Sequence, residues 1–65
     1  MTKSRQVQIK FNIETSAFGE YPVPEITTIL DNIKTRLLAQ NYIESKWNDI
    51  RDTNGNTVGQ FKIDI

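Results

Sequence analysis

The spacing of the apolar residues changes along the chain, and this change most constrains the fold. Near the start, apolar and polar residues alternate, with the apolar ones at Val7, Ile9, Phe11 and Ile13. Further on, apolar residues recur every three or four positions, at Ile26, Ile29, Leu30, Ile33 and Leu37. The first pattern predicts a half-buried strand over 5–14, and the second predicts an amphipathic helix over 24–40.

The residues around the helix supply its start and stop signals. Pro24 and Glu25 suit a first helical turn, where a missing backbone donor costs little and a negative charge is favourable. Asn41 is expected to adopt the left-handed conformation that ends a helix. The segment 15–23 contains a glycine and a proline and is therefore expected to be a loop.

The last third of the chain predicts a hairpin whose turn contains Asn54-Gly55. A two-residue turn would mix apolar and polar side chains on both faces, which a half-buried sheet does not tolerate. A three-residue loop, with Asp52 opening the turn and Gly55 in the left-handed conformation, separates the faces better. We therefore expect strands over 42–51 and 57–65 around a turn at 52–56.

This register assigns the hairpin side chains to faces. Trp47 lies opposite Phe61 on the core side, whereas Ile50 lies opposite Val58 on the outer face. The expected core joins the apolar stripe of the helix to the inward side chains of the sheet, which are Val7, Ile9, Phe11, Ile13, Trp47, Phe61 and Ile63.

The order strand, helix, strand, strand predicts one α+β domain over residues 1–65. The helix returns the chain so that the first two strands run parallel, and the third fits between them, antiparallel to both. We expect a two-layer fold with a three-stranded antiparallel sheet in the order 1-3-2 and the helix packed on one face.

Composition argues against an enzyme. The 65 residues include no cysteine and no histidine, which removes thiolate metal ligands and the commonest acid–base group. The turn at 52–56 superficially resembles a calcium loop, but its glycine comes fourth where an EF-hand requires it sixth. We expect no catalytic residue, no cofactor and no metal site.

The chain shows no targeting or membrane segment. No apolar run follows the basic start, and the longest uninterrupted apolar stretch is three residues, Leu37-Leu38-Ala39. A signal peptide or a membrane helix needs a much longer run. We expect a soluble protein of the cytoplasm that does not contact membranes.

Apolar residues in excess of the core point to protein binding. Aromatic residues beside polar ones are the usual anchors of protein interfaces. The candidate partner-binding residues are Phe18, Tyr21, Tyr42, Ile50 and Val58. The first two strands are free edges that could also pair with a target or with a second copy, as in a homodimer.

Nucleic-acid binding is the alternative. Single-stranded RNA modules display aromatic residues on an open sheet face, and the candidate basic residues on that face are Lys10, Lys46 and Lys62. Against this interpretation, Tyr42 is the only aromatic residue expected there, and eight basic residues balance eight acidic ones. A neutral chain lacks the electrostatic footprint of phosphate binding.

The size, the absence of histidine and the element order resemble those of many small single-domain proteins of phages and mobile elements. Several of those proteins bind and inhibit a host protein, and the resemblance covers no motif. We therefore expect a non-enzymatic protein-binding module, of the kind that inhibits a host enzyme or defence complex by occlusion. A nucleic-acid-binding regulator and an assembly subunit pairing through edge strands are the alternatives.

Overall fold

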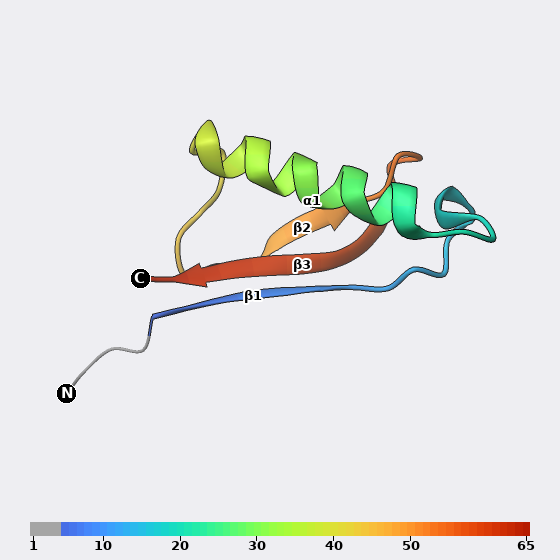
Figure 1. The fold of residues 1–65 in the computed structure, drawn as a ribbon. Coiled ribbons are helices and arrows are strands. Elements are labelled where there is room, and N and C mark those ends of the chain that lie inside the picture. Colours follow the sequence, from blue (N-terminus) through green and yellow to red (C-terminus); the bar gives the residue numbers. More distant parts are fainter. Residues whose placement is uncertain (1–4) are drawn as a thin grey trace.

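The computed structural model describes residues 5–65, which form one helix and three strands (Figure 1). The elements, in chain order, are β1 (Gln6–Phe11), the short 3-10 turn η1 (Ser16–Phe18), α1 (Val23–Leu38), β2 (Asn48–Arg51) and β3 (Thr57–Asp64). The strands form one antiparallel sheet in the order β1-β3-β2, and α1 lies on one face of it. The predicted fold class and strand order are confirmed.

The helix ends at Leu38, and its left-handed capping residue comes one position earlier than predicted. Gln40 adopts the left-handed conformation, with φ of 56°, and its N–H donates to the carbonyl of Leu37. The N–H of Asn41 donates to the carbonyl of Arg36 at 2.8 Å. These two bonds form the Schellman motif, in which the residue before Asn41 is the left-handed one. The prediction of Asn41 as the cap is therefore wrong by one position.

The hairpin turn has the predicted three-residue loop. Gly55 is left-handed, with φ of 85°, and its N–H donates to the carbonyl of Asp52 at 3.0 Å. The N–H of Asp52 donates to the carbonyl of Asn56 at 2.9 Å, which closes the loop. Asp52 and Gly55 thus determine the length of the hairpin loop, as predicted.

The predicted register fails immediately beyond the turn, because β3 contains a bulge. Arg51 pairs with Thr57, but Ile50 pairs with Gly59, so Val58 has no partner on β2. A bulge redirects the side chains that follow it. Val58 and Phe61 are three residues apart, yet both are buried in the core together with Ile50. The predicted place of Ile50 and Val58 on the outer face is wrong.

Trp47 is also misplaced by the predicted register. The strand β2 begins at Asn48 rather than at residue 42, and Asn48, not Trp47, pairs with Phe61. The buried amide of Asn48 bonds to the backbone of Ile43 and Lys46, which holds the preceding loop. Trp47 is 47% exposed and lies outside the core.

The core sits between α1, β2, β3 and η1. Its buried apolar residues are Phe18, Ile29, Ile33, Ile50, Val58 and Phe61, with Phe11, Ile26, Leu37 and Tyr42 partly buried around them. The rings of Phe11 and Phe18 stack with their centroids 6.4 Å apart. Val7, Ile9 and Ile13, which the alternation placed in the core, are exposed instead.

The hairpin turn is tied to the rest of the fold by two carboxylates. Asp52 is buried and accepts hydrogen bonds from the hydroxyl of Thr15 and from Asn54 and Asn56. Glu25, in the first turn of α1, accepts from the backbone N–H of Thr53 at 2.8 Å and from its hydroxyl. The turn therefore contacts both the loop before the helix and the helix itself.

Gly59→Ala is expected to destabilise the protein by at least about 2 kcal/mol. A Cβ at Gly59 would overlap the backbone of Lys10 and Phe11, so β1 and β3 would have to separate. Urea unfolding followed by circular dichroism measures the change. The exposed Gln60→Ala is the control and is expected to stay within about 0.5 kcal/mol of the native protein. Equal stability of the two variants would contradict the close approach of the strands.

The stability of the protein is expected to fall in acid because of Asp52. The hydroxyl of Thr15 lowers the pKa of its carboxyl; burial opposes this, and Asn56 and Asn54 add to the lowering. Since the folded pKa lies below the unfolded one, the stabilisation is complete above about pH 4 and is lost as pH falls through the folded pKa.

Urea midpoints measured from neutral to acidic pH test this dependence. Asp52→Asn should flatten the curve, whereas Asp31→Asn, which makes the same charge change on the exposed side of α1, should retain the acid-dependent loss. An unchanged acid limb in Asp52→Asn would contradict the assignment.

Candidate functional site

The helix is not centred on the sheet. Among the structural elements, α1 lies closest to β2 and η1, and β1 is the strand farthest from it (Figure 1). The guanidinium of Arg36 donates to the carbonyl of Asp49 on β2 at 2.7 Å and stacks over the ring of Phe61, 4.9 Å from its centroid. This contact holds the polar flank of the helix over β2.

The opposite flank of the helix is apolar and faces the side of β1. Asn32, four positions before Arg36, lies on the side of α1 next to β2. Because successive residues of a helix are rotated by about 100°, Leu30 projects from almost the opposite side of α1. The half-buried Ile26 and Leu37 share the flank of Leu30 by their spacing of four and seven. The part of the sheet that α1 covers therefore ends along this flank, and β1 lies beyond it.

Beside this flank, β1 presents apolar side chains that the helix does not cover. Ile9 pairs with the buried Phe61 and Val7 pairs with Ile63, so both lie on the same sheet face as the helix. Val7 is 59% exposed, Ile9 43% and Leu30 45%. We call Val7, Ile9 and Leu30 the apolar shelf. Exposed apolar patches mark interaction sites, and these three side chains all lie on the helix side of the sheet.

The backbone of β1 is also open. The N–H of Asn12 donates to the carbonyl of Val58 at 2.9 Å, in the same register as the β1–β3 ladder. In an antiparallel pair only alternate residues bond to a given neighbour. The even residues of β1 therefore bond to β3, and the N–H and C=O groups of Val7, Ile9 and Phe11 point to the free edge. No described element lies beyond this edge (Figure 1).

The other edge of the sheet is better protected. Strand β2 has only four residues, and Arg36 occupies the outward carbonyl of Asp49. Short strands and covering side chains are the ways in which proteins block unwanted strand pairing. Of the two edges, β1 is the one available to another strand.

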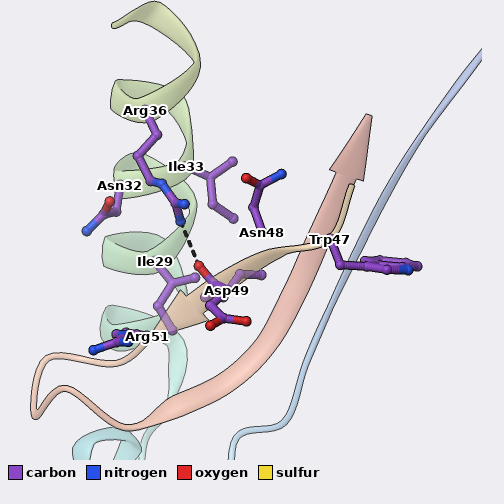
Figure 2. A pocket seen from close by; sticks show the side chains of 9 residues that line it. Ile29, Asn32, Ile33, Arg36, Trp47, Asn48, Asp49 and Arg51 are labelled. Carbon is purple, nitrogen blue, oxygen red and sulfur yellow. Dashed lines mark hydrogen bonds between the residues drawn. The ribbon is translucent and has the colours of Figure 1, made fainter. Parts of the chain in front are cut away.

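A hollow of about 480 Å³ lies between α1 and β2. Figure 2 shows Arg36 reaching across it to Asp49, with Asn32 and Arg51 at its rim and Trp47 pointing away from it. The hydrogen bond from Arg36 to the carbonyl of Asp49 spans this hollow, so the hollow is part of the helix–sheet contact. It contains no nucleophile with an adjacent base.

The helix-free face of the sheet carries the tryptophan. The ammonium of Lys62 lies 5.6 Å from the centre of the Trp47 ring, and Lys10 and Gln60 join Trp47 around a second hollow of about 420 Å³. An aromatic residue thus lies on the open face, where Tyr42 alone was expected. Asp49 bonds to Gln60 and Asp64 pairs with Lys62, so the face also carries negative charge.

The structure separates the predicted partner-binding residues. Phe18, Ile50 and Val58 are buried in the core, and Tyr42 is partly buried against it, so the first three cannot present their side chains to a partner. Only Tyr21, which is 70% exposed, stands free in the loop before α1.

The predicted basic residues are brought together only in part. Lys10 and Lys62 lie on the outer face of β1 and β3, and Lys46 lies exposed in the loop before β2. The alternation in β1 signalled the shelf residues Val7 and Ile9, but gave no sign that the helix would leave them uncovered.

The structure describes residues 5–65. In that part of the chain, no group of three or more acidic side chains is placed to hold a metal ion. Over the same residues, the structure holds no helix with the length and apolar character needed to cross a bilayer.

Comparison with known proteins adds no relative. No family model, no curated protein and no solved structure matches this chain.

Proposed function

We propose that this chain is a non-enzymatic protein-binding module that docks its target through the apolar shelf. The observation that carries the proposal is the exposure of Val7, Ile9 and Leu30 on one side of the molecule, next to the open edge of β1. The shelf replaces the predicted patch at Ile50 and Val58, whose side chains belong to the core.

The physical argument is the cost of leaving the shelf in water. Burying a large aliphatic side chain is worth about 1.5–3 kcal/mol, so three half-exposed ones leave roughly 2–4 kcal/mol unrealised. A partner that covers the shelf gains this free energy.

Such a module acts by occlusion, because its proposed site is a docking surface that covers part of the target. A target whose own functional surface docks on the shelf is blocked for the lifetime of the complex. This fits the general resemblance to the small phage-type inhibitors of host enzymes or defence complexes, with the host protein as the partner.

Leu30→Lys is expected to weaken capture of the target at least tenfold, because it places a charge within the apolar shelf. Tagged protein is used to recover partners from host lysate after nuclease treatment, and the recovered amounts are compared by quantitative mass spectrometry. Leu38→Lys is the matched control, since Leu38 is 77% exposed and lies on α1 away from Leu30.

Both variants must show native circular dichroism and a melting temperature close to that of the native protein. A partner recovered equally by the native protein, Leu30→Lys and Leu38→Lys would contradict docking through the shelf.

The position of Trp47 favours a second candidate, the binding of single-stranded nucleic acid on the helix-free face. A half-exposed indole beside Lys10 and Lys62 offers a base a surface to stack on and offers phosphate two cations. The carboxylates of Asp49 and Asp64 on the same face, and the zero net charge, weigh against it.

An oligonucleotide titration tests this second candidate. Binding should quench the fluorescence of Trp47, the only tryptophan, and weaken steeply with salt. Trp47→Ala should abolish the binding of a labelled strand while changing stability by no more than about 1 kcal/mol, because the side chain lies outside the core. No change in emission at about 100 µM oligonucleotide would exclude it.

A further inference from the structure

We propose that a second copy of this chain pairs with the open edge of β1. The two β1 strands run antiparallel about a two-fold axis at Ile9, which joins the two sheets into one of six strands with both helices on the same face. This inference goes beyond the proposed function, because it names a partner for the strand edge that borders the apolar shelf.

The hydrogen-bonding pattern of β1 limits how two copies can pair. The outward N–H and C=O groups belong to Val7, Ile9 and Phe11, since the even residues bond to β3. A second β1 must therefore place odd residues opposite odd residues. This also keeps the apolar side chains of both copies on the helix side and the polar ones on the outer face.

Side-chain complementarity selects one register from those that remain. With Ile9 opposite its own copy, Val7 faces Phe11 and Gln8 faces Lys10, so every apolar residue of β1 meets an apolar one. A shift of two residues in one direction places Phe11 opposite Arg5. The same shift in the other direction places Lys10 opposite its own copy, which is unfavourable between like charges.

The position of the helix leaves room for this pairing. Because α1 lies over β2 and β3, about four strand spacings of 4.8 Å, or roughly 19 Å, separate the two helices of the pair. A helix with its side chains is about 10 Å wide, so the helices do not collide. The shelves of the two copies then adjoin on the helix side, between the two helices.

The other edge offers no equivalent site. Strand β2 is four residues long, and the side chain of Arg36 bonds to the carbonyl of Asp49 on that edge. A symmetric strand pairing through β2 would first have to displace this contact. The structure therefore assigns self-association to β1.

A single introduced thiol tests the register directly, because the chain contains no cysteine. In Ile9→Cys the two thiols face each other with Cα atoms about 5.5 Å apart, within the range of a disulfide. In the control Val7→Cys the two Cα atoms are about 13 Å apart along the strands, beyond that range. Both positions are exposed, so the thiols are comparably accessible.

Under mild oxidation, Ile9→Cys is expected to form a covalent dimer several times faster than Val7→Cys. Equal rates, or cross-linking of Val7→Cys alone, would overturn the register. Failure of both variants to cross-link would overturn the pairing.

Sedimentation equilibrium of the native protein provides a second measurement. It is expected to show a dimer, and Ile9→Lys is expected to raise the dissociation constant at least tenfold by opposing two ammonium groups on the axis. Leu38→Lys should leave it unchanged. A native protein that stays monomeric up to about 1 mM, where even a weak complex is populated, would overturn the proposal.

The two proposals fail in different ways. If the native protein is monomeric but Leu30→Lys still loses its target, the shelf binds a partner and the second-copy inference is wrong. If the protein is dimeric but no target depends on Leu30, self-association stands and the proposed docking function is wrong.

Discussion

The bulge at Val58 is the constraint on which most of this structure depends. One unpaired residue in β3 allows Val58 and Phe61 to point into the same core although they are three positions apart. The shift also brings Asn48 opposite Phe61 and leaves Trp47 outside the core. The bulge is followed by a glycine because the backbone of Phe11 lies where a side chain at that position would be. The bulge thus determines both which side chains form the core and which aromatic residue lies on the outer face.

The second determinant is a single arginine that fixes the lateral position of the helix. Arg36 bonds to the backbone of β2 and stacks on Phe61, so the polar flank of α1 is held at the β2 side of the sheet. A helix about 10 Å wide cannot also cover β1 in a three-stranded sheet with strands about 4.8 Å apart. The exposure of Val7 and Ile9 follows from this geometry. The same contact that protects one edge therefore leaves the other one open.

Local chemistry explains what could be predicted from the sequence, and competition between distant residues explains what could not. The periods of two and 3.6 predicted strand and helix, and Asp52 and Gly55 predicted the turn, because each signal acts within a few residues. The register depended on whether Trp47 or Asn48 would lie opposite Phe61, which local pattern does not decide. Gly59 was the overlooked signal, since a glycine inside a strand pattern indicates a bulge or a close backbone approach. The predicted patch failed for the same reason, because the bulge moved Ile50 and Val58 into the core. The shelf was missed because its exposure depends on the contact of Arg36 with β2, which joins residues far apart in the sequence.

The small size of the chain connects the core to the proposed interface. A domain of this length buries only about 60% of the surface that its unfolded chain exposes, so it cannot cover every apolar residue that its strands require. Exposed apolar side chains lie at several places on the surface, but Val7 and Ile9 lie on the strand whose outer backbone groups are also open. Exposed apolar side chains and unpaired backbone N–H and C=O groups therefore occur together at the outer edge of β1. A strand from another molecule satisfies the backbone groups, and a partner on the helix side covers the side chains, so both requirements favour association at β1.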